Sequence, residues 1–285
     1  MSRTVYLNGD YVAEEDAKIS VFDRGFLFAD GVYEVTSVLE GKLVDFSGHM
    51  TRLHRSLNEL DMQEACNDDT LLEIHRELVK ANDLQEGLIY MQVTRGVADR
   101  SFLYPDKGTK PTLFVFTQKG NLVDSAPAQQ GIKIILIEDQ RWGRRDIKTI
   151  QLLFASMAKM EAKRKGVDDA WLVSNGKVNE GTSNNAYILT HDDVIVTHNI
   201  ANEILSGITR IAVLKCADKL NLTVEERPFS VEEAKNAKEA FITSASTFVT
   251  PVIEIDGQII GSGSPGEVVQ NLRVTYLQEA RKAAI

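Results

Sequence analysis

The stretch "RWGRRDIKTIQLLFASMAK", residues 141–159, changes from basic and polar to apolar along its length. It follows "IKIILIED", a run of β-branched and apolar residues that predicts a strand over 132–139. Its second half has apolar residues at helical spacing, which predicts a helix that ends near Gly166. The apolar stripe of this helix is expected to consist of Ile150, Leu153, Phe154 and Met157.

Lys148 stands at the junction between the polar and the apolar half of this stretch. Burial beside apolar neighbours disfavours a charged ammonium, so a lysine at the edge of a core loses its proton more easily. A neutral amine can attack an aldehyde and form a Schiff base. The alternative is an ordinary surface lysine among the basic residues Arg141, Arg144 and Arg145.

The chain before residue 119 predicts an α+β arrangement. Asn8-Gly9 and Glu40-Gly41 each separate two short alternating runs, which is typical of β-hairpins. A helix is expected from an N-cap at Ser47, and a second one over 68–83. Two further strands are predicted, over 87–96 and 111–118.

The turn-rich segment 119–131 predicts a linker between two domains. Beyond it we expect a strand meander over 169–199, a helix over 206–220, strands over 239–260 and a last helix over 265–283. The domain prediction is therefore an N-terminal α+β domain over 1–118, the linker over 119–131, and a C-terminal domain over 132–285.

Composition narrows the function classes. The chain has 285 residues and a net charge of −9, which argues against nucleic acid as the main partner. Its 2 cysteines, Cys66 and Cys216, stand far apart, so neither a zinc site nor a disulfide framework is expected. With no signal-like start and no membrane-length apolar run, we expect a cytoplasmic protein without a membrane partner.

Four other stretches could hold an anionic or aromatic ligand. "NEGTSN" places Glu180 at a strand end, and in "ILSGITR" Ile208 and Thr209 open a helix whose N-terminus favours anions. "FITSASTFVTP" crowds hydroxyls around Ser244 and Ala245, and "SGHMTRLHRS" places Arg52 off the apolar stripe of its helix. Taken singly, these stretches also fit a solvated hairpin corner, an ordinary helix cap, a polar turn and a solvent-exposed helix face.

Together they make a more specific set. One amine, one carboxylate, two loops of small residues and an arginine are what a site for pyridoxal 5′-phosphate requires. The amine would bind the aldehyde, the carboxylate would keep the ring nitrogen protonated, and the loops and the arginine would hold the phosphate.

Six motifs resemble those of the class IV (fold type IV) pyridoxal phosphate aminotransferases, and among them most of all the D-amino-acid transaminases. They span most of the chain and occur in the family's order: "FDRGFLFADGVYEV" (22–35), "HMTRL" (49–53), "DIKTIQLL" (146–153), "NEGTSNNAY" (179–187), "LSGITR" (205–210) and "TPV" (250–252). The resemblance implies a small N-terminal α+β domain and a larger C-terminal pseudo-barrel α/β domain that binds the cofactor. It also implies a homodimer in which each active site is completed by the neighbouring subunit.

The resemblance implies a role for each matching residue. Lys148 would be the catalytic Schiff-base lysine, and Glu180 would meet the ring nitrogen. The other cofactor-binding residues would be Arg52, Ser183, Ile208, Thr209, Ser244 and Ala245. The substrate side would be lined by Tyr33, Val35, Arg100 and Phe102.

These motifs predict transfer of an amino group from a D-amino acid to a 2-oxo acid such as pyruvate or 2-oxoglutarate. D-amino-acid transaminases often carry Arg-x-His in the substrate loop, whereas this chain has Arg100-Ser101-Phe102. Phe102 cannot donate a hydrogen bond to a carboxylate and makes the pocket more apolar, which leaves an (R)-selective amine transaminase open. An enzyme like aminodeoxychorismate lyase is a third reading, and a binding protein without a reactive lysine is a fourth. Ala245 stands where the family usually has a phosphate-binding Thr.

Overall fold

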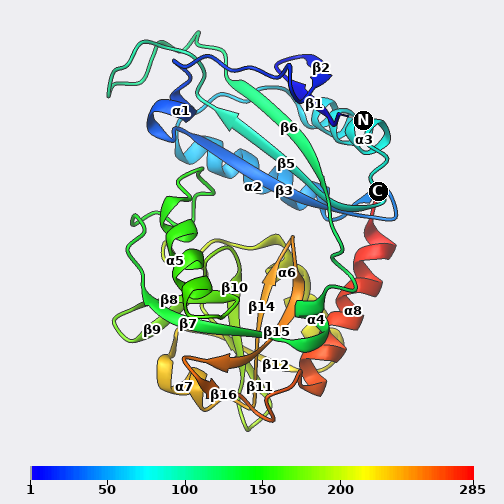
Figure 1. Ribbon diagram of the computed structural model, residues 1–285, viewed down its shortest axis with the longest axis vertical. Coiled ribbons are helices and arrows are strands. Elements are labelled where there is room, and N and C mark those ends of the chain that lie inside the picture. The colour runs from blue at the N-terminus through cyan, green and yellow to red at the C-terminus, as the bar shows by residue number, and fades with distance from the viewer. Residues whose placement is uncertain (1) are drawn as a thin grey trace. The chain divides into compact units, whose positions relative to one another are not determined.

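The computed structural model describes residues 2–285 and divides into two compact units. Unit 1 comprises residues 1–121, 147–151 and 283–285, and unit 2 comprises residues 122–146 and 152–282. Each unit is built around its own β-sheet (Figure 1). The domain boundaries at 118/119 and 131/132 stay predictions. Residues 147–151, which contain Lys148, belong to unit 1.

Unit 1 contains a sheet with the strand order β2-β1-β6-β5-β3-β4, in which every neighbouring pair is antiparallel. Asn8 and Gly9 have positive φ at the first hairpin, as do Glu40 and Gly41 at the later one, so both predicted turns are confirmed. The strands are β1 (Thr4–Leu7), β2 (Asp10–Ala13), β3 (Gly31–Leu39), β4 (Lys42–Leu43), β5 (Glu86–Thr94) and β6 (Thr112–Lys119).

Three helices belong to this unit: α1 (Arg24–Phe28), α2 (Phe46–Glu59) and α3 (Asp68–Ala81). The apolar sides of α2 and α3 pack with the sheet into one core, which includes Met50, Leu53 and Leu78. The predicted N-cap of α2 is wrong by two residues, because Asp45, with φ of 53°, precedes the helix and Ser47 lies inside it. The predicted second helix is confirmed as α3.

A short extended strip carries Lys148 along one edge of β3. β4 pairs with β3 only at Val38 and Leu39, so the first residues of β3 keep a free edge on that side. Residues 148–150 occupy it: Tyr33 N–H donates to the Lys148 carbonyl (3.0 Å), and Ile150 N–H donates to the Gly31 carbonyl (3.1 Å). Gly31 leaves room for the strip, since a Cβ there would lie 3.1 Å from Ile150 Cδ1.

Unit 2 contains a mixed ten-stranded sheet with the order β12-β11-β10-β14-β15-β7-β8-β9-β13, in which β16 pairs with β15. The pairs β11/β12, β15/β7 and β7/β8 are parallel, and the others are antiparallel. The strands are β7 (Ile132–Glu138), β8 (Asp169–Ser174), β9 (Lys177–Gly181), β10 (Asn185–Leu189), β11 (Val194–Thr197), β12 (Thr223–Glu226), β13 (Phe229–Ser230), β14 (Glu239–Ser244), β15 (Phe248–Ile255) and β16 (Gln258–Ile259).

The helices of unit 2 flank this sheet (Figure 1). They are α4 (Ala126–Gln130), α5 (Leu153–Arg164), α6 (Ile208–Lys219), α7 (Val231–Lys235) and α8 (Glu267–Ala283). The stripe predicted for the helix after Lys148 is wrong for Leu153 and Met157 but right for Phe154, which packs against the core. The helix begins at Leu153 and buries Ala158 and Ala162, while Leu153 and Met157 are 76% and 58% exposed.

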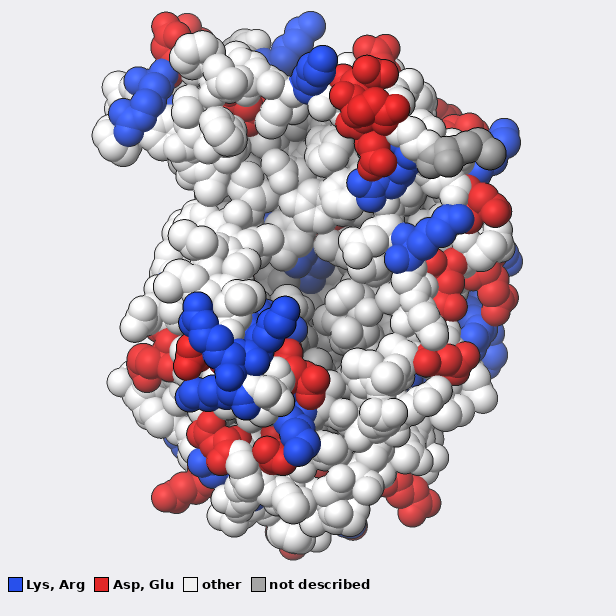
Figure 2. All heavy atoms as spheres, in the orientation of Figure 1, with Lys and Arg blue, Asp and Glu red and all other residues white. Residues whose placement is uncertain are grey.

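Charges of both signs are interspersed on the visible face of the molecule, where Lys and Arg side chains lie among Asp and Glu side chains (Figure 2). Neighbouring charges of opposite sign offset each other's electrostatic field. Salt screens what remains beyond a Debye length, roughly 8–10 Å at physiological ionic strength. Within residues 2–285, no helix is long and apolar enough to cross a membrane.

Candidate active site

Lys148 lies beside an aromatic ring in unit 1. Its Nζ is 4.1 Å from the centroid of the Tyr33 ring, and its own backbone N–H faces Ser56 Oγ at 3.5 Å. The side chain is half-buried, so its amine is neither sealed in the core nor free on the surface. This half-buried placement against the Tyr33 ring fits the reactive-amine interpretation better than that of an exposed surface lysine.

Tyr33 and Val35 lie on one face of β3, because side chains two residues apart point to the same side of a strand. Both are half-buried, and the Tyr33 ring stacks on Tyr90 with centroids 5.4 Å apart. The Lys148 amine and these two candidate substrate residues are thus presented by the same stretch of sheet edge.

Arg52 is held on the opposite face of β3 by Glu34. Its Nε donates to Glu34 Oε1 (2.8 Å) and its Nη2 donates to Oε2 (2.7 Å), while His49 Nδ1 lies 2.7 Å from Oε2. Burial raises the pKa of Glu34, but the charge and hydrogen bonds of Arg52 and the bond to His49 outweigh it and bring the pKa to about 2. Arg52 is therefore a fixed, buried cation, so the expectation of a solvent-exposed helix face is wrong.

The helix that carries Arg52 lies against the strip that carries Lys148. Ser56 follows Arg52 by one helical turn on α2, so the two side chains lie on the same side of the helix. Since Ser56 Oγ faces the Lys148 backbone N–H at 3.5 Å, α2 and the strip are neighbours within unit 1.

The loop between β5 and β6 carries Arg100 and Phe102, which are both exposed. Phe102 packs edge-on against Phe28, and the Arg100 guanidinium lies 5.4 Å from the centre of the Phe28 ring. These two candidate substrate residues are therefore grouped around α1.

Glu180 lies in unit 2, in β9, and is almost fully buried. Arg141 Nη1 donates to its Oε1 (2.7 Å), and Oε2 accepts from Asn185 Nδ2 (3.2 Å) and from Leu205 N–H (3.1 Å). Arg141 is also bound by Asp139, whose two carboxylate oxygens accept hydrogen bonds from Arg141 Nε (3.0 Å) and Arg141 Nη2 (2.8 Å). The carboxylate of Glu180 is therefore oriented from two sides.

The ionisation of this network follows from burial and pairing. Burial raises the pKa of Glu180, and the charge and hydrogen bonds of Arg141 offset this only in part, so the pKa stays above its usual range. Burial also raises the pKa of Asp139, but the bonds from Arg141 and Asn179 more than compensate and leave it lowered. Glu180 is the weaker acid of the two, which suits a group that shares a proton with a basic ring nitrogen.

The N-terminus of α6 lies against the same asparagine that binds Glu180. Gly207 is the N-cap residue and has no side chain with which to cap the helix. A Cβ at Gly207 would lie 2.1 Å from Asn185 Oδ1, so only glycine fits here. Ile208 and Thr209 form the buried first turn, where N–H groups and the helix dipole favour an anion.

The turn after β14 belongs to the same neighbourhood, because Asn185 in β10 is paired with Thr243, the residue before Ser244. Ser244 Oγ accepts from Thr247 N–H (3.2 Å) and lies 3.1 Å from Ser246 Oγ. Ala245 lies in this turn and is half-buried. Ser183, in the turn between β9 and β10, is exposed, while its neighbours Thr182 and Asn184 both donate to Asp169.

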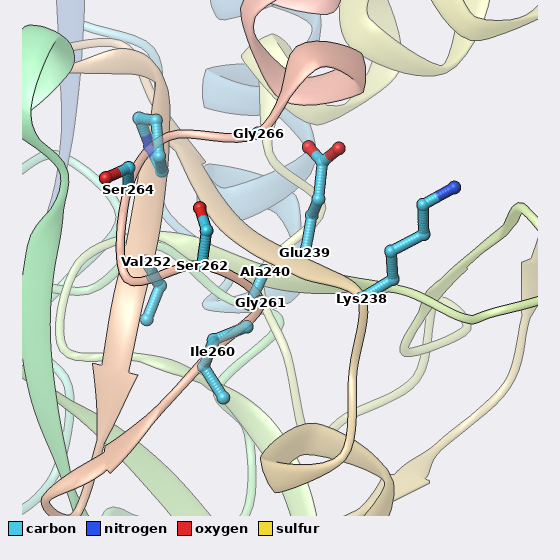
Figure 3. A pocket seen from close by; sticks show the side chains of 10 residues that line it. Lys238, Glu239, Ala240, Val252, Ile260, Gly261, Ser262, Ser264 and Gly266 are labelled. Atoms are coloured by element: carbon cyan, nitrogen blue, oxygen red, sulfur yellow. The ribbon is translucent and has the colours of Figure 1, made fainter.

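Unit 2 also has a separate cavity of about 260 Å³, which holds none of the candidate residues (Figure 3). Glu239 points its carboxylate at the start of α8 and accepts from Val268 N–H (3.2 Å) and Val269 N–H (2.9 Å). Glu239 is therefore a helix-capping residue. The cavity is lined by Lys238, Glu239, Ala240, Pro251, Val252, Ile260, Gly261, Ser262, Ser264 and Gly266.

The sequence matches the family model "Amino-transferase class IV" over residues 31–255. That span contains Lys148, Glu180 and both candidate phosphate loops. The chain belongs to the class IV aminotransferases.

Relatives of this aminotransferase match over almost their whole length. It is 38% identical to the D-alanine aminotransferase of Staphylococcus aureus (strain N315) over 269 residues, which is 94% of this chain and 95% of the relative. It is 38% identical to the D-alanine aminotransferase of Bacillus licheniformis over 279 residues, which is 97% of this chain and 96% of that protein.

Solved structures confirm the predicted α+β fold type IV architecture. The branched-chain amino acid aminotransferase of Escherichia coli superposes with a TM-score of 0.88 at 24% identity, covering 98% of this chain and 95% of that one. A second branched-chain amino acid aminotransferase, from T.th. and solved with pyridoxamine 5′-phosphate, gives a TM-score of 0.88 at 25% identity, covering 98% and 94%.

Pyridoxal 5′-phosphate is the cofactor of the class IV aminotransferases, and the residues present fit it. A buried carboxylate held by three N–H donors suits a ring nitrogen, and an uncapped helix start opened by an obligatory glycine suits a phosphate. Both features lie in unit 2 and share Asn185, so the ring and phosphate ends of one ligand would have neighbouring binding groups.

Four supporting residues were missed by the sequence reasoning: Glu34, His49 in its bonded role, Arg141 and Asn185. Glu34 stands within the "YEV" motif and Asn185 within "NEGTSNNAY", but period and composition do not reveal their partners. Arg141 was interpreted only as one of several basic residues near Lys148. Its pairing with Glu180, 39 residues later, depends on β7 and β9 both pairing with β8.

Proposed function

We propose that this class IV aminotransferase transfers the amino group of a D-amino acid to a 2-oxo acid such as pyruvate or 2-oxoglutarate. The observation that supports it most strongly is the 38% identity to D-alanine aminotransferases over 94% of the chain, with Lys148, Glu180 and Arg100 all inside the matched length. The geometry agrees with it, because the Lys148 amine lies beside Tyr33 on a sheet edge and the Glu180 carboxylate is fixed by Arg141.

The cofactor, when bound, supplies an aldehyde that reacts with amines and a ring that withdraws electrons. Lys148 Nζ would hold that aldehyde, and its free amine would take the proton from the substrate Cα as a general base. Glu180 would bind the ring nitrogen and keep a proton on it. Arg52, the Ile208 and Thr209 N–H groups, and the loops with Ser183, Ser244 and Ala245 bind the phosphate side.

The substrate side is formed by Tyr33, Val35, Arg100 and Phe102. Arg100 pairs with the substrate carboxylate, because a guanidinium can form two parallel hydrogen bonds to it. Phe102 adds an apolar wall where a hydrogen-bond donor would otherwise stand. That residue favours a second activity on (R)-amines whose second arm is apolar.

The functional unit is a homodimer whose active sites each borrow the loop around Arg100 from the neighbouring subunit. Two exposed apolar surfaces support this proposal, because monomeric proteins rarely expose large apolar patches. In unit 2, Leu153, Met157 and Met160 line one face of α5 at 76%, 58% and 48% exposure. In unit 1, the exposed residues Phe22, Phe26, Phe102 and Leu103 gather around α1 and the loop after β5.

A cytoplasmic location fits the two free cysteines, Cys66 and Cys216.

A panel of amino donors tests the function. Purified enzyme with pyridoxal 5′-phosphate is assayed on D-alanine, L-alanine and both enantiomers of 1-phenylethylamine, with 2-oxoglutarate as acceptor for the alanines and pyruvate for the amines. We expect D-alanine to be turned over with ping-pong kinetics and L-alanine at a small fraction of that rate. Faster turnover of (R)-1-phenylethylamine than of D-alanine would make the amine the primary substrate, and pyruvate release without any acceptor would indicate a lyase.

The Arg100→Ala variant separates the two donor classes. We expect its KM for D-alanine to rise about tenfold or more, because a charged hydrogen-bonding partner is lost. The KM for (R)-1-phenylethylamine, which has no carboxylate, should stay within about twofold, on the scale of a neutral surface substitution. Equal effects on both donors would show that Arg100 does not bind the carboxylate.

A further inference from the structure

Arg24 is a buried arginine that the proposed mechanism does not use. Its side chain is 3% exposed, although it belongs to the five-residue helix α1 near the edge of unit 1. Its Nε donates to Asp30 Oδ2 (2.7 Å), and its Nη1 donates to the carbonyls of Ser101 (2.8 Å) and Leu103 (3.4 Å). Those two carbonyls flank Phe102, so Arg24 grips the candidate substrate loop by its backbone.

A second buried arginine supports the same loop from the other side of Asp30. Arg95 Nε donates to the same oxygen, Asp30 Oδ2, at 2.8 Å. Its Nη1 and Nη2 donate to the carbonyls of Asp61 (2.8 Å) and Leu60 (2.7 Å) at the end of α2. The Arg95 guanidinium also lies 3.6 Å from the centre of the Tyr104 ring. One carboxylate thus joins two arginines, and each arginine contacts the loop.

The platform beneath Arg24 is fixed by Asp23. Its Oδ2 accepts from the hydroxyls of Thr94 (3.0 Å) and Thr112 (2.6 Å), and its Oδ1 accepts from Gly25 N–H (2.8 Å). Thr94 ends β5 and Thr112 begins β6, so α1 is tied to both strands from which the loop emerges (Figure 1). A Cβ at Gly25 would lie 2.4 Å from Thr94 Cγ2, which shows how closely α1 approaches the strand end.

The loop itself has little else to hold it. Phe102, Leu103 and Tyr104 are 83%, 79% and 55% exposed, and no regular strand or helix occurs between β5 and β6. Apart from the contacts of Arg100 and Phe102 with Phe28, the hydrogen bonds and ring contacts that reach residues 100–104 from elsewhere in the described chain come from Arg24 and Arg95. Within one subunit, the loop is therefore held by the two arginines and by Phe28.

We propose that Arg24, coupled to Arg95 through Asp30, is a positioning residue that sets where Arg100 and Phe102 stand and thereby the preference for amino donors with a carboxylate. The inference rests on the proposed function, because it assigns donor recognition to this loop. Arg24 acts through the loop and touches neither substrate nor cofactor.

The test compares Arg24→Met with a matched control, Arg3→Met, in the cofactor-loaded enzyme. Arg3 also donates to a backbone carbonyl (Thr117), pairs with a carboxylate (Glu14) and lies over a phenylalanine ring (Phe116), but it does not contact the loop. The first measurement is the rate of trypsin cleavage after Arg100 under native conditions, followed by mass spectrometry. We expect Arg24→Met to raise this rate about tenfold or more and Arg3→Met to leave it unchanged, since a hydrogen bond to a charged group contributes strongly.

The second measurement is steady-state kinetics. Arg24→Met should raise KM for D-alanine about tenfold while kcat stays within about threefold, because the loop binds substrate and does not move the proton. Arg24→Lys, which keeps the charge but cannot replace all three hydrogen bonds, should fall between wild type and Arg24→Met. Tyr104→Leu removes the ring contact with Arg95 at a side chain that is 55% exposed, and it should raise trypsin cleavage in the same direction with little effect on stability.

Unchanged cleavage after Arg100 in both Arg24→Met and Tyr104→Leu would overturn the proposal, as would a loss confined to kcat. If the wild-type enzyme has no D-amino-acid activity, the proposed function fails, but the trypsin result still decides whether Arg24 anchors the loop. If the cleavage rate rises and donor preference does not change, the claim about specificity is wrong.

Discussion

At the scale of single residues, the site depends on charges that are buried in pairs. Glu180 needs Arg141 because a carboxylate taken out of water without a partner would remain protonated. In unit 1, the buried carboxylate of Glu34 is paired in the same way with the cation Arg52. In both cases a candidate ligand-binding residue is oriented by a partner of opposite charge.

The Arg141→Met variant tests this dependence through pH. The pKa of Glu180 is already raised by burial, and without Arg141 it rises further, so the folded protein holds a proton that the unfolded chain releases. Arg141 also lowers the pKa of Asp139, so part of the loss of stability is already present at pH 4.5. The loss grows as the pH rises and reaches about 3–5 kcal/mol near neutrality. Thermal or urea unfolding between pH 4.5 and 8 measures it.

Arg164→Met is the control for this experiment. Arg164 pairs with Glu161, and both side chains are exposed (69% and 41%), so its removal should cost less than about 1 kcal/mol with little dependence on pH. A pH-independent deficit in Arg141→Met, or equal deficits in both variants, would show that Arg141 does not govern the ionisation of Glu180.

The sequence offers candidate site residues but not the residues that hold them. Lys148, Glu180 and Arg52 become candidates only when the motifs are taken together, and their roles stay predictions. Arg141 could not be assigned, because its contact with Glu180 exists only once β7, β8 and β9 are paired in register. Glu34 was missed for a similar reason, since it meets Arg52 only after α2 packs on the sheet.

At the scale of elements, the start of α6 combines two requirements at one glycine. Gly207 must leave the first-turn N–H groups open to an anion, and it must also fit against Asn185, which holds Glu180. The phosphate end and the ring end of the site are thereby coupled through one strand.

The Gly207→Ala variant should weaken cofactor binding. The added Cβ, 2.1 Å from Asn185 Oδ1 if nothing moves, displaces either the helix start or the asparagine. We expect the Kd for pyridoxal 5′-phosphate to rise about tenfold or more, because a hydrogen bond to a charged group is misplaced. Absorbance titration of the apoenzyme measures it. Gly143→Ala is the matched control, because no heavy atom lies within 4 Å of a Cβ there, and wild-type affinity in Gly207→Ala would contradict this assignment.

The sequence predicts the ends of strands well where a turn contains residue types that favour positive φ. Asn175-Gly176, like the two hairpins of unit 1, takes the positive φ angles that its residue types favour. The predicted stripe of α5 is partly wrong because the pattern identifies apolar residues without identifying what covers them. The helix buries alanines and packs Phe154 against the core, and it leaves Leu153, Met157 and Met160 outside.

At the scale of the whole molecule, those uncovered residues bear on assembly. Leu153, Met157 and Met160 recur at intervals of four and three, so they form a continuous face of α5. A face of this kind favours a second protein surface over water, and in the proposed homodimer it is covered by the other subunit.

The double variant Leu153→Lys/Met157→Lys should convert the dimer to a monomer, because burying two uncompensated charges disfavours association. Size-exclusion chromatography with light scattering measures the mass at micromolar concentration. Val274→Lys, at an isolated apolar residue that is 54% exposed, should leave the mass unchanged. A wild-type mass of one chain would rule out the dimer.

The candidate site residues come from distant parts of the chain and from both units. Lys148 is supplied by a five-residue strip that joins the sheet of unit 1, although the chain on both sides of it belongs to unit 2. Composition and turn signals marked 119–131 as the domain boundary, but they carry no sign of this later excursion, which depends on the free edge of β3.

The most direct measurement is to identify the lysine that binds the cofactor. The protein is loaded with pyridoxal 5′-phosphate, reduced with borohydride, digested and mapped by mass spectrometry, with Lys148→Arg treated in parallel. The account predicts that the phosphopyridoxyl mass is found on the wild-type peptide containing Lys148 and is lost from that peptide in the variant. Stoichiometric modification of a different lysine, or an unmodified Lys148 in fully loaded protein, would contradict it.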